Sequence, residues 1–151
     1  MIAVKEVMHT RPLSIGPRDT IAHVVELFER DGFNAIPVVD ERGRLLGIVT
    51  QLEILHALRP APDAEPTNLL AVADMPVERV MRRGVIAVEP NEPLLTAADI
   101  MLETRLRSLP VIERDKRGDR MLVGIVSQGD LLGAMRAALP TARLAVASPA
   151  G

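Results

Sequence analysis

The sequence contains no cysteine, which excludes disulfides, thiolate chemistry and cysteine-bound metal ions. It also lacks tryptophan and tyrosine, so the usual stacking platform for single-stranded nucleic acid is absent. The formal net charge of −2 gives no electrostatic reason to expect nucleic acid or an anionic membrane as a partner. No apolar run approaches the roughly 18 residues that a bilayer span requires, and the N-terminus lacks the apolar segment of a secretory signal. We therefore expect a cytoplasmic protein whose partners are neither nucleic acid nor membrane.

The motifs of the common catalytic sites are missing as well. Neither the Walker pattern nor the glycine fingerprint of dinucleotide-binding folds occurs in the sequence. The three histidines, His9, His23 and His56, lack the i, i+4 spacing of a helical metal site. Ser127 does not sit in a nucleophile elbow, because Ile125 stands where that motif has glycine. We therefore expect neither an enzyme nor a metal site, and a binding role gains by elimination.

What the sequence does contain is one pattern written twice. Three motifs recur in the same order: Val-Met at 7–8 and 80–81, a Pro-Val segment at 35–40 and 108–113, and Gly-Ile-Val-Thr/Ser at 47–50 and 124–127. The first two repeat after 73 residues (80 − 7 and 108 − 35) and the third after 77 (124 − 47), so the second copy has four extra residues. These extra residues fall in the polar stretch 114–120, which is typical of a surface turn. The duplication predicts a pseudo-twofold arrangement, with related clefts where the copies meet.

Each copy predicts one long amphipathic helix. Apolar residues at i, i+3, i+4 and i+7, counted from Ile21 and again from Leu94, indicate a buried stripe on each helix. Thr20 is a candidate N-cap and Gly32 a candidate stop for the first helix, and Pro93 is a start signal for the second.

Short β-branched runs complete each unit, which reads helix, strand, helix, strand, strand, helix. In the first copy an opening strand is expected at 13–15, a hairpin at 35–39 and 44–49, and a second helix from Thr50. The second copy echoes them, with an opening strand at 85–88. The sequence therefore predicts an α/β (α+β) fold of two repeats, each a small three-stranded sheet with flanking helices, packed with pseudo-twofold symmetry.

These elements suggest a division of the chain. We expect the first repeat at 1–58, a linker at 59–74, the second repeat at 75–136 and a tail at 137–151. Each repeat has only about 55 to 60 residues, a length at which burial is marginal, so both should share one globular module. Disorder is expected only in the proline-rich part of the linker, 59–67, and in the alanine- and proline-rich part of the tail after Leu139.

Two segments carry the polar chemistry that remains. Thr50 is followed after three residues by Glu53, and Ser127 in the same way by Asp130. This spacing is the capping-box signature, in which a hydroxyl and a carboxylate satisfy the free amides at a helix start. The same geometry presents amides and a hydroxyl to a phosphate, and a carboxylate to both hydroxyls of a ribose. Helix capping and ligand binding are therefore both open readings.

The order of these motifs resembles a tandem pair of cystathionine-β-synthase (CBS) domains, the arrangement called a Bateman module. The resemblance covers about residues 3–134, with each motif present twice. It implies a regulatory module that binds an adenosine-containing ligand, such as AMP, ADP, ATP or S-adenosylmethionine, in clefts between the repeats. No obligatory cofactor is implied. The resemblance also implies a homodimer, with helix faces bearing Leu27 or Leu102 as candidate contacts, and a regulated protein in trans.

The resemblance also assigns ligand-binding residues to each cleft. One cleft would use Ser127, Asp130, Leu13, Phe33 and Asn34, and the other Thr50, Glu53, Ile86, Leu106 and Arg107. In the family pattern the hydroxyl contacts phosphate or ribose, and an Asp holds the ribose diol. Glu53 departs from that Asp by one methylene, whereas Arg107 offers a forked cation suited to phosphate. We expect the Asp130 cleft to bind ribose better, and the Glu53 cleft to be weaker, altered or vacant.

Plainer roles stay open for several of these residues. Phe33 would fill a hinge between helix and strand, Arg107 would lie on a solvated rim, and Arg82-Arg83 reads as an exposed turn. If Thr50 and Ser127 only cap helices, the clefts stay empty. A ligand-free structural or interaction module is therefore the alternative function.

Overall fold

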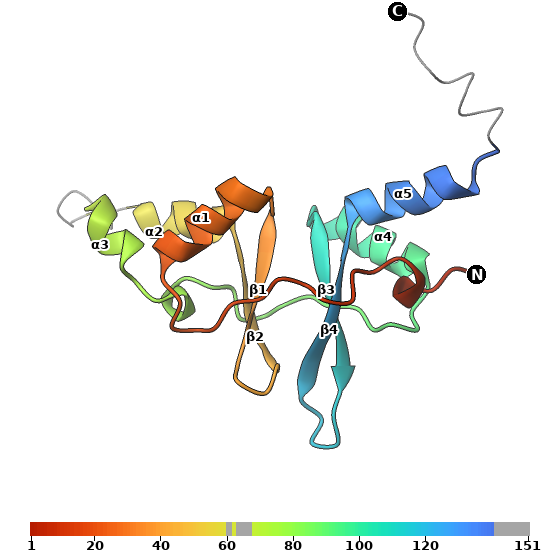
Figure 1. Ribbon diagram of the computed structural model, residues 1–151, viewed down its shortest axis with the longest axis horizontal. Helices are drawn as coiled ribbons and strands as arrows, with labels where there is room; N and C mark the ends of the chain where they lie inside the picture. The colour runs from red at the N-terminus through yellow and green to blue at the C-terminus, as the bar shows by residue number, and fades with distance from the viewer. Residues whose placement is uncertain (60–61, 63–67, 141–151) are drawn as a thin grey trace, which may run out of the picture.

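The computed structural model describes residues 1–59, 62 and 68–140, arranged as two similar halves side by side (Figure 1). The first half contains α1 (Ile21–Asp31), β1 (Ala35–Val39), β2 (Leu45–Thr50) and α2 (Gln51–Leu58). The second half contains α4 (Leu94–Thr104), β3 (Ser108–Arg114), β4 (Arg120–Ser127) and α5 (Gln128–Ala138). This order confirms the predicted α/β fold of two structural repeats. The expected disorder in the proline-rich linker and in most of the tail concerns segments outside the described residues.

Helices α1 and α4 begin and end where the apolar periodicity predicts. The Thr20 hydroxyl accepts a hydrogen bond from the His23 amide at 3.2 Å, and Gly32 ends α1 with a φ of 67°. Helix α4 starts after Pro93 and ends at Arg105, which has a φ of 61°. Both C-caps therefore adopt the left-handed conformation, for which glycine is the usual residue.

Helix α3 (Leu69–Ala73) lies inside the segment predicted as a linker and was not expected. The Asn68 side chain caps it by accepting a hydrogen bond from the Leu70 amide at 3.0 Å. Val72 is buried, and the helix packs against α1 and α2. Because α3 has only five residues, an apolar periodicity of several turns, which the prediction of helices used, does not arise.

The strands of each half form an antiparallel hairpin, and the opening strand is shorter than predicted. β1 pairs with β2, and β3 pairs with β4. The expected third strand is a single parallel bridge in each half, Ile15 to Val38 and Val88 to Val111. Pairing stops there because Pro17 and Pro90, two residues further along, have no amide hydrogen to donate.

The segment that precedes each half in the sequence packs against the other half. Figure 1 shows the N-terminal segment starting beside α4 and crossing to α1, while the segment after α3 crosses in the opposite direction. A short 3-10 helix, η1 (Val4–Glu6), packs on the second half, where the Val4 amide donates to the Glu92 carbonyl at 2.9 Å. Its counterpart, η2 (Val77–Arg79), packs on the first half, where the Val77 amide donates to the Asp19 carbonyl at 2.7 Å. We call 1–12 and 75–84 the crossing arms.

Three clusters of buried apolar side chains form the core. The first lies in the first half and includes Val77 of the second arm, and the next lies in the second half and includes Val4 of the first arm. The last cluster, around Ile48, Val85 and Ile112, joins the two halves. Each half therefore needs the arm of the other to complete its core.

The two leucines expected on dimer-forming helix faces differ in exposure. Leu27 is 4% exposed and belongs to the first core cluster, so the prediction of a dimer contact through Leu27 is wrong. Its side chain points toward the sheet because it continues the buried stripe of α1. Leu102 on α4 is 79% exposed and stays a candidate contact.

The tips of the two hairpins are joined by ion pairs. Arg42, in the β1–β2 turn, donates to Asp115 at 2.9 Å and to Asp119 at 3.4 Å, both in the β3–β4 turn. The sequence had indicated only a surface turn at 114–120, of which Arg114 and Arg120 are paired in the strands. The backbone also connects the tips, since the Leu122 amide donates to the Gly43 carbonyl at 3.0 Å.

Candidate functional site

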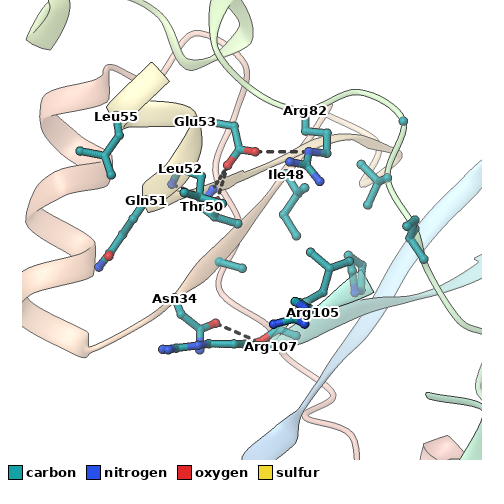
Figure 2. A pocket seen from close by; sticks show the side chains of 17 residues that line it. Asn34, Ile48, Thr50, Gln51, Leu52, Glu53, Leu55, Arg82, Arg105 and Arg107 are labelled. Atoms are coloured by element: carbon teal, nitrogen blue, oxygen red, sulfur yellow. Dashed lines mark hydrogen bonds and ion pairs between the residues drawn. The ribbon is translucent and has the colours of Figure 1, made fainter. Parts of the chain in front are cut away.

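A cavity of about 300 Å³ lies at the junction of the two halves. Its walls come from the β1 start, the β2–α2 junction, the second crossing arm and the segment between α4 and β3 (Figure 2). All five residues predicted for one cleft line it, namely Thr50, Glu53, Ile86, Leu106 and Arg107. The structure therefore brings together that predicted set.

The start of α2 forms the polar side of the cavity. The Thr50 hydroxyl accepts a hydrogen bond from the Leu52 amide at 3.2 Å, and the Glu53 carboxylate accepts one from the Thr50 amide at 2.7 Å. Glu53 is only 7% exposed, and its second carboxylate oxygen lies 3.3 Å from Nε of Arg82. The capping box expected from the sequence is therefore present, and an arginine of the crossing arm neutralises its buried carboxylate.

Aliphatic side chains form the apolar part of the cavity. Ile48 comes from β2, Val85 and Ile86 follow the crossing arm, and Leu106 and Pro110 flank the start of β3. No aromatic side chain contributes to this lining. A flat ring bound here would therefore be enclosed by branched aliphatic groups from both halves.

Two arginines lie across the cavity from Thr50 and Glu53. Figure 2 shows Arg105 and Arg107 on the side away from Glu53 and Arg82. Among the residues that the structure describes, neither guanidinium forms an ion pair. Both therefore retain hydrogen-bond donors for an anion.

Asn34 and Ser108 link the two halves at this cavity. The Ser108 hydroxyl donates to the Asn34 side-chain oxygen at 3.0 Å, and both residues line the cavity. Asn34 was predicted for the other cleft, together with Ser127 and Asp130. Asn34 and Arg107 are equivalent by the 73-residue repeat (107 − 34) and line the same cavity, so both copies of this segment lie close to the pseudo-twofold axis.

The rest of the predicted second cleft does not line this cavity. Ser127 and Asp130 form a capping box at the start of α5, with the Ser127 amide donating to Asp130 at 2.8 Å. Asp130 also lies 2.9 Å from Nε2 of His9, on the first crossing arm. Leu13 packs against the first core cluster, and Phe33 is exposed between α1 and β1.

The pairs His9–Asp130 and Arg82–Glu53 are equivalent by symmetry, and the sequence analysis missed both. His9 and Arg82 are 73 residues apart (82 − 9), each directly after a Val-Met motif. Each arm also forms two backbone hydrogen bonds to the strand it crosses, at His9 with Ile125 and at Arg82 with Ile48. The repeat register carried this signal, but Arg82 had been interpreted only as part of an exposed turn.

Arg105 is the other lining residue that the sequence analysis did not select. It stands at the position of Gly32 in the repeat register (105 − 73), so a comparison of the two copies marks it as unusual. Within the described ranges, no group of three or more histidine, aspartate or glutamate side chains is placed to hold a metal ion. No helix there is long and apolar enough to cross a membrane.

Comparisons with known proteins identify the family. The CBS domain model matches residues 4–60 and 77–137. CBS domain-containing protein YhcV of Bacillus subtilis is 33% identical over 131 residues, which cover 87% of this chain and 84% of that protein. The CBS domain pair of protein MJ0100, solved with 5′-methylthioadenosine and S-adenosylmethionine, is similar with a TM-score of 0.71 and 26% identity, covering 91% of this chain and 98% of that one. CBSX2, solved with AMP, has a TM-score of 0.73 and 25% identity over the same shares. The chain belongs to the CBS-domain family and is a tandem CBS pair, a Bateman module.

Proposed function

We propose that this CBS pair is a regulatory module that binds an adenosine-containing ligand in the cavity between its halves and signals occupancy to a partner or to its own oligomer. The observation that carries the proposal is the cavity itself. It brings the start of α2 from the first repeat together with two free arginines from the second, around aliphatic side chains of both repeats. Its volume of about 300 Å³ is at the lower end of the range for small-molecule sites.

Each part of an adenosine nucleotide has a matching group in this cavity. The base would lie between Ile86, Leu106 and the neighbouring aliphatic side chains, with Glu53 accepting from the ribose hydroxyls beside Arg82. The phosphate would meet the guanidinium of Arg107. Two CBS pairs of similar fold have been solved with AMP or with S-adenosylmethionine and 5′-methylthioadenosine, which supports this class of ligand.

The cavity supports a different ranking of the two clefts from the one expected from the sequence. We place the ligand first at Glu53, because Thr50, Glu53 and Arg107 all line the cavity. Ser127 and Asp130, at the other helix start, do not line it. The departure from Asp to Glu at position 53 is offset here by Arg82, which holds the longer side chain in place.

Binding between the halves also suggests how occupancy would be signalled. The ligand would contact β2 and α2 of one repeat and the α4–β3 segment of the other. It would therefore stabilise one relative placement of the halves over another. The free energy of this shift equals the difference between the ligand's binding free energies for the two placements. A partner or a second copy that touches both halves would respond to this change.

A thermal-shift panel with AMP, ADP, ATP and S-adenosylmethionine tests the proposal. A ligand at 100 times its dissociation constant adds about 2.7 kcal/mol, which raises the melting temperature of a chain of this size by about 5 to 10 °C. Calorimetry with Glu53→Gln and the matched Asp130→Asn then locates the site. We expect about a tenfold loss of affinity for Glu53→Gln, as for a hydrogen bond to a charged group, and less than about twofold for Asp130→Asn.

The second candidate function is the ligand-free interaction module. It is favoured by one observation, that Glu53 and Asp130 are each already paired with a basic side chain and a helix cap. If none of the four compounds changes the melting temperature, this candidate replaces the first. If Asp130→Asn loses more affinity than Glu53→Gln, the ligand lies in the other cleft.

A further inference from the structure

Arg105 has a backbone conformation that ordinarily belongs to glycine. Its φ is 61°, and it is the only residue other than glycine with a positive φ in the described part of the chain. The equivalent residue of the first repeat is Gly32, with a φ of 67° at the end of α1. The two C-caps therefore have the same geometry, but only the second carries a side chain.

Nothing in the fold requires an arginine at this position. A β-carbon makes the left-handed conformation unfavourable, and arginine lacks the short polar group with which asparagine or aspartate eases it. The Arg105 side chain is exposed and forms no ion pair or hydrogen bond within the ranges that the structure describes. Backbone conformations of this kind in residues other than glycine cluster at functional sites, which makes Arg105 a candidate for such a role.

The Arg105 side chain lines the cavity, where it changes the balance of charge. The charged lining residues are Glu53, Arg82, Arg105 and Arg107, which give a net charge of +2 (three positive, one negative). Arg82 forms an ion pair with Glu53, whereas Arg105 and Arg107 lie on the opposite side of the cavity, where no carboxylate lines it (Figure 2). Each guanidinium can donate two parallel hydrogen bonds to one phosphate, so the two arginines together can bind two phosphates.

We propose that Arg105 is a specificity-determining residue that makes this cavity select a nucleotide with two or three phosphates over a monophosphate. This inference rests on the proposed adenosine site and names the class of ligand within it. Arg107 binds the α-phosphate of the nucleotide, and Arg105 donates to the β-phosphate. The same excess of positive charge disfavours S-adenosylmethionine, whose sulfonium is a cation.

The variant Arg105→Gly tests the inference without endangering the fold. Glycine stands at the equivalent position of the first repeat, so the helix end is retained and the melting temperature does not fall. Calorimetry is performed on wild type and variant with adenosine, AMP, ADP and ATP. We expect the variant to lose threefold to tenfold in affinity for ADP and ATP, with adenosine and AMP changed by less than about twofold, because an exposed guanidinium contributes modestly.

A matched variant and added salt separate this effect from a general change of charge. Arg117→Ala removes one positive charge from the exposed β3–β4 turn, outside the cavity, and leaves all four affinities unchanged. The difference between wild type and Arg105→Gly also shrinks in about 1 M salt, where the screening length is about 3 Å.

The failures of the two proposals are distinguishable. If wild type binds AMP as tightly as ADP and ATP, or if Arg105→Gly lowers the affinity for all four compounds by one factor, the selectivity role is wrong while the adenosine site stands. If wild type binds none of the four, the adenosine site and the selectivity role fail together.

Discussion

Gly47 and its counterpart Gly124 are predicted to tolerate no side chain, because a crossing arm passes directly over each of them. A β-carbon at Gly47 would lie 2.6 Å from the sulfur of Met81 and 2.9 Å from the carbonyl oxygen of Arg82. At Gly124 it would lie 2.8 Å from both the sulfur of Met8 and the carbonyl oxygen of His9. The repeated Gly-Ile-Val motif therefore starts with glycine because the arm needs that space.

The cost of Gly47→Ala follows from what would have to move. The Met81 side chain has room to rotate only at the expense of the first core cluster, to which it belongs. The Arg82 carbonyl is fixed, since Arg82 and Ile48 exchange two backbone hydrogen bonds of 2.9 Å. Overpacking of this kind costs about 1 to 3 kcal/mol, which corresponds to a fall in melting temperature of about 3 to 10 °C for a chain of this length.

Calorimetric or fluorescence melting of Gly47→Ala measures this cost, and Gly133→Ala is the matched control. Gly133 lies inside α5 with open space around its α-carbon, so alanine there should raise stability by up to about 1 kcal/mol through helix propensity. The two substitutions are chemically identical and have opposite expected signs. If Gly47→Ala melts at or above the wild-type temperature, the close approach of the arm is not a constraint and the reasoning is refuted.

Two further predictions concern assembly and pH. Leu102→Glu should convert the homodimer expected for this chain into a monomer in analytical ultracentrifugation, because Leu102 is exposed on α4, whereas Glu103→Gln beside it should not; a wild-type monomer would contradict this. The pKa of Asp115 lies below its ordinary value of 3.8, chiefly because the backbone amide of Asp119 donates a hydrogen bond to its carboxylate. The amide of Arg117 also lowers this pKa, and these effects outweigh desolvation, which raises it. A lowered folded-state pKa adds stability that is present above the ordinary value and is lost as the pH falls through the folded one. Asp115→Asn should therefore be less stable than wild type at pH 7, with a difference that shrinks below about pH 4 in acid melting curves; a constant difference would contradict the assignment.

The elements that the sequence predicted best are those whose signals are local. Thr20 and Gly32 bound α1, and the [Thr/Ser]-x-x-[Glu/Asp] spacing marks the starts of α2 and α5, because caps act over three or four residues. The hairpins followed from short β-branched runs. The four extra residues of the second copy do not lengthen its turn as expected: β3 and β4 have 7 and 8 residues where β1 and β2 have 5 and 6, so the insertion extends the paired strands. Helix α3 gave no such signal, since five residues do not make two turns of periodicity.

The crossing of the arms was not predictable from such signals. Val4 and Val77 are apolar residues in short 3-10 helices, and nothing in the residues around them tells on which half they are buried. The consequence for the site was considerable, because the arm brings Arg82 to Glu53 and His9 to Asp130. The 73-residue repeat shows from the sequence that His9 and Arg82 are equivalent, but it does not predict which side chains the two residues contact.

The same register explains why the two clefts of this chain are expected to differ in function. Symmetry gives each helix start one carboxylate and one basic side chain from an arm, Glu53 with Arg82 and Asp130 with His9. The basic group at Glu53 is a guanidinium with several donors in a fixed fork, whereas the one at Asp130 is an imidazole that contacts the carboxylate through a single nitrogen. The segment before β3 then adds Arg105 and Arg107 to the Glu53 cavity, where the first repeat has only Gly32 and Asn34. Since the scaffold is common to both repeats, the proposed difference in binding rests on these few substitutions, which add positive charge beside Glu53.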